Sequence, residues 1–291
     1  MNRFYIQIVL FLLIISLYVN NKTLATEPVP EDTTPEETLD LTIDTTHQYP
    51  TSEEIYEANK HLLCTNPEET IQAEKLMNEA VTHLEYHATS KHAYRLFGEY
   101  HPKRMYLYKK KLKDYTKVRK VEYIIDDPNK YNKIINKLWD PDSDSYFYKG
   151  SVKRKIARVY TPNLVLIQHR SKKWPWSREK YFYALAANFE VSEDQTIIVI
   201  ASANINDHNP SNKEYQNTII KNANLFTTEI DSEDDIRKGK LKKTVVNLIG
   251  YIIKKKDKYV DITYVESIDR HVPSYLKRMI TQVLEFVFIH K

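Results

Sequence analysis

The sequence predicts an α+β fold in which one large, curved antiparallel sheet packs against helices. Helical stripes of apolar residues occur near the N-terminus, in the middle and at the C-terminal end of the chain, and runs rich in Val, Ile and Tyr lie between them. Only 4 of the 291 residues are glycine, and neither common glycine-rich phosphate motif occurs. We therefore do not expect a nucleotide-binding loop.

The first 48 residues are expected to lie outside the folded domain. Arg3 and the apolar stretch 6–19 predict a signal peptide of residues 1–25, cleaved after Ala25, with an uncleaved membrane anchor as the alternative. Residues 26–48 are rich in Thr, Pro and Glu and predict a disordered acidic linker. The folded domain is then residues 49–291. Because Cys64 is the only cysteine, this domain can form no internal disulfide.

Four helices follow from start signals and apolar spacing. Ser52 is the expected N-cap of the first, and Pro67 followed by two glutamates starts the second. The third is short and ends at Trp139. The last begins at Pro273 and reaches almost to the C-terminus, and its apolar stripe requires it to pack on the sheet. The predicted ranges are 52–62, 67–87, 129–139 and 273 onward.

Strands are predicted where β-branched and aromatic residues alternate with polar ones between turn signals. Four strands after Trp139 follow one another closely enough to form a contiguous antiparallel sheet. Residues 207–217 are expected to form a loop, 219–230 are ambiguous, and 231–235 form an acidic turn. The predicted strands are 94–99, 105–112, 118–125, 152–160, 164–170, 181–191, 196–205, 244–253 and 259–266.

The order of these elements resembles that of StAR-related lipid-transfer (START) domains, over roughly residues 52–291. Three motifs support the resemblance: Leu138-Trp139-Asp140, Ser177-Arg178-Glu179 and Pro273-Ser274-Tyr275-Leu276. The resemblance implies a helix-grip fold, in which the curved sheet wraps around the long C-terminal helix and encloses an internal lipid cavity. START domains usually carry Asp at the position of Glu179, and we expect the ion pair of that motif to survive.

Three longer passages, at residues 60–68, 202–208 and 261–267, resemble the fam-a proteins of rodent malaria parasites. That family is START-related, secreted, and associated with phospholipid transfer and with export toward the host cell. The resemblance therefore implies a secreted protein of the parasitophorous vacuole or the host cell. The sequence contains no Arg-x-Leu-x-acidic export signal, which leaves the vacuole open as the destination.

A phospholipid cargo requires an apolar cavity with polar groups near the headgroup. Arginine suits a phosphate, and a cage of aromatic rings suits a quaternary ammonium. The alternative for each arginine is an ordinary surface position on a strand, and Trp139 is expected in the core rather than in a cage. The candidate lipid-binding residues are Arg154, Arg158, Gln168, Arg170, Trp174, Trp176, Tyr181 and Tyr183, with Asn188 as a weaker one.

The START resemblance also implies that the C-terminal helix acts as a lid together with the loop 207–217. The lid residues expected to contact the membrane are Lys277, Arg278, Val283, Phe286 and Val287. The alternative is that this stripe only packs in the core.

Three classes of function are open. The first is a non-enzymatic carrier of a phospholipid, with phosphatidylcholine as the expected cargo. It would act as a monomer and contact membranes transiently. The second is an antigenic or host-interaction module that has lost lipid transfer. This reading would be favoured if side chains such as Phe182, Phe189 and Tyr264 filled the cavity. The third is an RNA-binding protein, because the chain has a net charge of +4 that rises once the acidic linker is left out.

No catalytic or metal site is expected. The sequence lacks a GxSxG elbow and an HExxH motif. His83 and His87 have the i, i+4 spacing of zinc ligands, but no third ligand follows at a recognisable spacing. We therefore expect no enzyme activity, no metal, no cofactor and no nucleic-acid partner.

Overall fold

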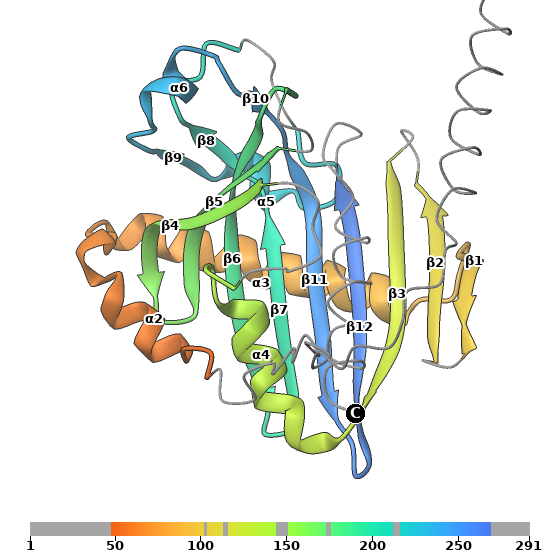
Figure 1. Cartoon of the computed structure of the whole chain (residues 1–291). Coiled ribbons are helices and arrows are strands. Elements are labelled where there is room, and N and C mark those ends of the chain that lie inside the picture. Colours follow the sequence, from red (N-terminus) through yellow and green to blue (C-terminus); the bar gives the residue numbers. More distant parts are fainter. Residues whose placement is uncertain are drawn as a thin grey trace, which may run out of the picture. The chain divides into compact units, whose positions relative to one another are not determined.

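The computed structural model describes residues 48–101, 104–112, 116–143, 151–172, 176–211 and 216–268 (Figure 1). The signal peptide, nearly all of the acidic linker and the terminal helix lie outside these residues and stay predictions. The candidate lipid-binding and lid residues that lie outside the described ranges are Trp174, Lys277, Arg278, Val283, Phe286 and Val287. Among the described helices, none has the length and apolar character needed to cross a membrane.

The helices begin close to the predicted start signals. Thr51, not Ser52, is the N-cap of α2 (Ser52–Ala58), because its hydroxyl accepts from Glu54 N at 3.2 Å and its own N–H donates to the Glu54 carboxylate at 2.7 Å. The Asn66 side chain caps the start of α3 by accepting from Glu68 N and Glu69 N. The described helices here are α2, η1 (Lys60–Leu62), α3 (Pro67–Thr89), η4 (Pro128–Lys130) and α4 (Tyr131–Trp139).

One large sheet forms the body of the structure, in the order β1-β2-β3-β12-β11-β7-β6-β5-β4. Neighbours along this order are antiparallel, and the short β10 pairs parallel with β6. The strands are β1 (Arg95–Tyr100), β2 (Met105–Lys111), β3 (Lys117–Asp126), β4 (Ser151–Thr161), β5 (Leu164–Lys172), β6 (Lys180–Ser192), β7 (Gln195–Ala201), β10 (Lys242–Lys243), β11 (Val246–Lys255) and β12 (Tyr259–Ile268). The predicted α+β class and antiparallel sheet are confirmed; the helix that the sheet would grip lies outside the described residues.

Helices lie on both faces of this sheet. The long α3 crosses behind β6, β7, β11 and β12 in Figure 1, and α4 lies in front of β7 and β11. We call these the α3 face and the α4 face. Buried residues of the α3 face include Leu185 and Val199, whereas Ala186 and Ile198 belong to the α4 face. Alternate residues of one strand therefore enter two separate hydrophobic cores.

Two predictions about the region after β7 are wrong in detail, and a stretch left ambiguous there takes a definite structure. The strand predicted over 196–205 is two strands, because Ser202 turns the chain: its hydroxyl donates to Tyr183 O at 2.9 Å and accepts from Val246 N at 3.0 Å. The second piece, β8 (Asn204–Asn206), pairs with β9 (Thr227–Glu229) in a separate sheet. The ambiguous stretch contains α5 (Asn222–Leu225) and β9, and the acidic turn continues into α6 (Asp234–Arg237).

Candidate functional site

A small apolar pocket lies on the α4 face, and we call it the α4 pocket. Its volume is about 30 Å³. It is bounded by α2, the end of α4, and strands β4 to β7. The described lining residues are Ile55, Leu138, Trp139, Pro141, Arg154, Ile156, Val165, Ile167, Ala186, Ile198 and Ile200.

Trp139 and Arg154 are the lining residues with side-chain hydrogen-bond donors. Trp139 is the last residue of α4 and is 8% exposed, and its indole Nε1 has no hydrogen-bond partner among the residues that the structure describes. Arg154 pairs across the sheet with His169, whose ring stacks on Phe182 at 4.9 Å, so Arg154 belongs to the α4 face. One Arg154 amino group donates to Ser143 O at 2.9 Å. The pocket thus combines an apolar lining with one positive charge and one buried N–H.

The helix end that positions Trp139 is built by the residue after it. Asp140 N donates to Asn136 O at 2.9 Å and closes the last turn, and its carboxylate accepts from Asp142 N at 2.9 Å. The predicted structural role of the Leu-Trp-Asp motif is confirmed, and Trp139 is a member of the core as expected.

Arg158, a predicted phosphate ligand, points to the opposite side of the sheet. Its guanidinium donates to the Glu69 carboxylate of α3 at 2.6 Å, to the Thr228 hydroxyl, and to Glu229 O at 2.8 Å. Burial raises the pKa of Glu69, but hydrogen bonds from Tyr160, Thr228 and Arg158 outweigh it and hold that pKa below its usual range. Arg158 therefore ties β4 to α3.

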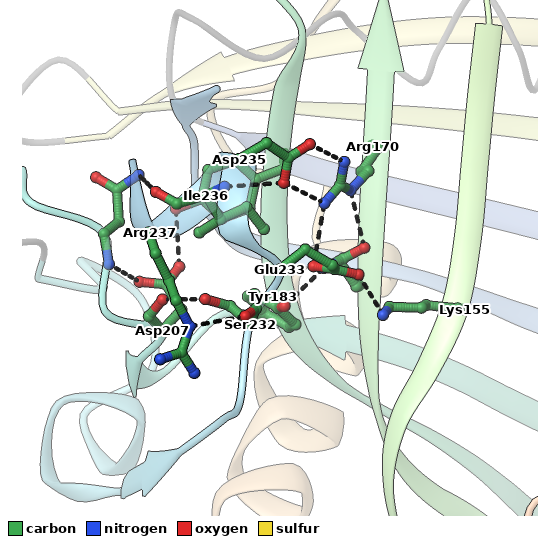
Figure 2. Close-up of polar contacts among 12 residues, drawn as sticks. Lys155, Arg170, Tyr183, Asp207, Ser232, Glu233, Asp235, Ile236 and Arg237 are labelled. Atoms are coloured by element: carbon green, nitrogen blue, oxygen red, sulfur yellow. Dashed lines mark hydrogen bonds and ion pairs between the residues drawn. The ribbon is translucent and has the colours of Figure 1, made fainter. Parts of the chain in front are cut away.

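Arg170 is also a structural residue of the α3 face. Its two amino groups donate to the two oxygens of Asp235, at 2.7 and 3.0 Å (Figure 2). One of these amino groups also lies 3.0 Å from the Glu233 carboxylate. The hydrogen bonds that Arg170 donates to Asp235 raise the pKa of Arg170, although burial opposes them. Burial likewise raises the pKa of Glu233, but Lys155 and Gln168 lower it to about 2. Arg170 fastens α6 to the sheet.

The predicted aromatic cage does not form among the described residues. Tyr181 is fully buried and donates to Asp207 at 2.8 Å, and Gln168 donates to the Tyr183 hydroxyl at 2.6 Å. Both tyrosines lie in the core of the α3 face. Trp176 is 83% exposed. These three rings and Gln168 are therefore not part of the α4 pocket.

The alternation of side chains explains why Arg154 reaches the α4 pocket and the other candidates do not, although Arg154, Gln168 and Arg170 also line a second hollow of about 480 Å³. In β5 and β6 the named residues Gln168, Arg170, Tyr181 and Tyr183 all stand on alternate positions of the α3 face. In β4, a bulge between Ile156 and Arg158 inserts an extra residue, so Arg158 faces α3 although Arg154 faces α4. Sequence spacing alone would have placed the two arginines on one face.

Residues that the sequence reasoning missed are the neighbours of the residues it named. Ile156, Val165, Ile167 and Ala186 line the α4 pocket from positions that alternate with the charged and aromatic candidates. The apolar character of these positions was the available signal.

Several other candidates have ordinary structural surroundings. Arg178 donates to Lys240 O at 2.9 Å and to Leu241 O at 3.2 Å, so the expected ion pair of its motif is replaced by contacts with carbonyls. Asp207, at the start of the predicted lid loop, is buried and accepts from Lys243 at 2.8 Å. His83 lies 3.5 Å from Glu79, whereas His87 is buried beside Tyr94.

Asn188 has a buried oxygen without a partner, but at a different place. Its amide donates to Ser52 at 3.2 Å, and its Oδ1 accepts no hydrogen bond from any described residue. It lines a separate groove with Glu74, Asn78 and Phe189. Asn188 therefore does not belong to the α4 pocket.

No protein-family model and no curated protein matches this sequence. Some solved structures resemble its backbone. Human STARD10 is 13% identical, with 70% of this chain and 78% of that one covered and a TM-score of 0.47. Human StAR-related lipid transfer protein 5 is 8% identical, with 76% and 94% covered and a TM-score of 0.47. The human StarD13 lipid transfer and protein localization domain is 13% identical, with 71% of this chain and 93% of that one covered and a TM-score of 0.43. The resemblance to fam-a proteins stays a prediction.

Proposed function

We propose that this chain binds one phospholipid in the α4 pocket, with the phosphate near Trp139 and Arg154. The observation that carries the proposal is the buried indole N–H of Trp139 at the wall of an apolar pocket, for which the described part of the chain offers no acceptor. A buried donor without a partner costs about 1–3 kcal/mol, which an oxygen of a bound ligand would remove. The guanidinium of Arg154 favours an anionic oxygen, and the apolar lining suits acyl chains.

Binding requires the pocket to widen. A lipid needs a cavity of several hundred Å³, whereas the α4 pocket has about 30 Å³. The first residue of α4, Tyr131, is held to β7 by a 2.9 Å hydrogen bond to Thr196, whereas the indole N–H of its last residue, Trp139, has no partner within the described ranges. We therefore expect α4 to separate from the sheet first at its Trp139 end.

The finer parts of the proposal follow the START and fam-a resemblance. They are that the cargo is phosphatidylcholine, that the protein moves it between membranes without enzyme activity, and that it does so as a secreted monomer. Of the described residues lining the α4 pocket, Trp139 is the one aromatic side chain. We therefore propose recognition through the phosphate, and we expect weak discrimination between choline and ethanolamine headgroups.

A second candidate is an interaction module that keeps the fold without carrying lipid. Phe182 and Tyr264, which would favour this function by filling the cavity, are both buried in the core of the α4 face. Together with the small volume of the α4 pocket, their burial is what supports this candidate.

Native mass spectrometry of the full chain, purified from a lipid-containing host and then incubated with mixed liposomes, tests both candidates. We expect one phospholipid per chain. Trp139→Phe removes the N–H with little change of shape and should lower lipid occupancy about tenfold. Trp176→Phe makes the same exchange at an exposed position and should leave occupancy unchanged.

The outcomes separate the proposals. A chain that takes up no lipid would favour the interaction module. A chain that takes up lipid equally well in wild type and in Trp139→Phe would be a lipid-binding protein with its site elsewhere.

A further inference from the structure

Basic residues stand directly opposite one another at one corner of the sheet. Arg95 of β1 pairs with Lys109 of β2, and Lys109 pairs with Arg119 of β3. Two residues further along β2, Lys111 pairs with Lys117 of β3. Like charges directly opposite in a sheet are destabilising. This arrangement therefore costs stability unless an anion is present.

The Glu266 carboxylate lies in this row and is already bound by Arg119 and Tyr264. Glu266 of β12 pairs with Arg119, lies 2.8 Å from its guanidinium, and has a side chain that is 1% exposed. The Tyr264 hydroxyl also donates to it, at 2.9 Å. In the part of the chain that the structure describes, Arg95, Lys109 and Lys117 are exposed and form no ion pair.

An exposed aromatic ring lies among these cations. A β-bulge between Leu96 and Gly98 gives Phe97 no partner on β2. The Phe97 side chain is 43% exposed, and Lys109 Nζ lies 5.3 Å from the centre of its ring. An exposed ring beside lysines combines an apolar group with positive charge.

We propose that this basic corner, formed by Arg95, Phe97, Lys109 and Lys117, docks on an anionic lipid bilayer. Cations near such a surface contribute attraction that salt screens, and an aromatic ring can enter the headgroup layer. Proteins that bind single-stranded nucleic acid use a basic groove with several stacking rings, whereas the basic corner presents one ring on three adjacent strands. An RNA partner is therefore the less favoured reading.

The basic corner is separate from the α4 pocket but shares its face of the sheet. Lys109 follows Met105 and Leu107 on alternate positions of β2, and both of those belong to the core of the α4 face. In the strand order, β1 to β3 lie at the opposite edge from β4 to β6. Docking on a bilayer and binding in the pocket can therefore be tested independently.

Cosedimentation of the full chain with vesicles tests the docking surface. The vesicles are pure phosphatidylcholine, or phosphatidylcholine with about 30 mol% phosphatidylserine. We expect binding to the anionic vesicles only, lost as salt is raised from about 0.1 to about 0.5 M. The triple variant Arg95→Gln, Lys109→Gln, Lys117→Gln should bind on the order of 100-fold more weakly.

A matched control removes the same number of charges at the other end of the sheet. Lys255, Lys256 and Lys258 are exposed at the turn between β11 and β12, and their replacement by Gln should change vesicle binding no more than about threefold. Equal loss in both triple variants would reduce the effect to net charge and overturn the proposal. Absence of wild-type binding to anionic vesicles would overturn it too, as would binding to a single-stranded RNA oligomer in place of vesicles.

Stability gives a second readout. Because the triple variant removes like-charge pairs, its urea midpoint at low salt should be equal to or above that of the wild type. A fall in the midpoint would contradict the electrostatic premise of the proposal.

Discussion

The two faces of the sheet use their polar residues differently. On the α3 face, Arg158 and Arg170 are each bound to carboxylates of a neighbouring element, and the Tyr181 hydroxyl is bound to Asp207. On the α4 face, Trp139 keeps a buried indole N–H at the wall of a pocket, with no acceptor in the part of the chain that the structure describes. Hydrogen-bonded pairs hold elements together, whereas an unused donor is available to a ligand. The residue type alone therefore does not distinguish a binding residue from a structural one.

The largest effect is expected for Arg158→Leu, on the α3 face. Removing Arg158 leaves Glu69, whose side chain is 16% exposed, without its cation, which should destabilise the protein by about 3 kcal/mol. Urea unfolding measures this change. Arg154→Leu, on the α4 face, removes a hydrogen bond from a charged donor to Ser143 O and should cost about 1.5 kcal/mol. Equal costs for the two variants would remove the difference between the faces.

Gly250→Ala tests how closely α3 packs on the sheet. A Cβ at Gly250 would lie 2.8 Å from Ile198 O and would overlap the Leu84 side chain of α3. Because the Ile198 carbonyl belongs to the neighbouring strand, we expect a loss of about 2–3 kcal/mol. Adding Leu84→Ala removes the overlap with the Leu84 side chain but leaves the close contact with Ile198 O. The stability lost through that contact should therefore not be recovered in the double variant. Unchanged thermal stability in Gly250→Ala would mean that α3 packs less tightly than described.

His87, on α3, should make stability depend on pH. Burial, with the charges of Lys110 and His83, lowers the His87 pKa from 6.5 to about 4. As pH falls below 6.5 the unfolded state therefore takes up the proton first, and stability is lost between pH 6.5 and about 4. Between about pH 7 and pH 5 the loss should be about 2 kcal/mol.

Urea midpoints at these two pH values measure the loss, and His87→Gln is the control. The variant should show a smaller fall than the wild type. An identical fall in both proteins would assign the acid sensitivity to carboxylates such as Glu69, whose pKa is lowered in the folded state.

The smallest effect on stability is expected for Trp139→Phe. The variant loses some packing but also removes the unpartnered donor, so the ligand-free protein should change by less than about 1 kcal/mol. Thermal unfolding of delipidated protein is the measurement. A loss as large as that of Arg158→Leu would show that the indole N–H contributes to folding, and would withdraw it from the proposed ligand site.

Sequence reasoning recovered most elements of the fold because their signals are local. Pro67, the two glutamates after it and the apolar spacing behind them start α3 where predicted. It failed after β7, where Ser202 ends the strand through hydrogen bonds to Tyr183 and Val246. Those partners lie on other strands, and no local pattern announces them.

The structure separates the predicted lipid-binding residues by location, and their role in binding a lipid stays a prediction. Arg154 lines the α4 pocket, but Arg158, Gln168 and Arg170 do not. The face of an arginine depends on the register of its strand, and one bulged residue in β4 reverses it. The lining apolar residues were visible in the sequence but could not be assigned to a face.

The sequence by itself determined the α+β class, the helix starts and the strands, since propensity, capping and alternation act over a few residues. Only the tertiary structure decided which cations are neutralised and which remain available. Arg158 meets Glu69 across 89 positions of the chain and Arg119 meets Glu266 across 147, whereas Lys109 faces other cations. The electrostatic role of a side chain is set by neighbours that the fold brings to it, and these neighbours are distant in sequence.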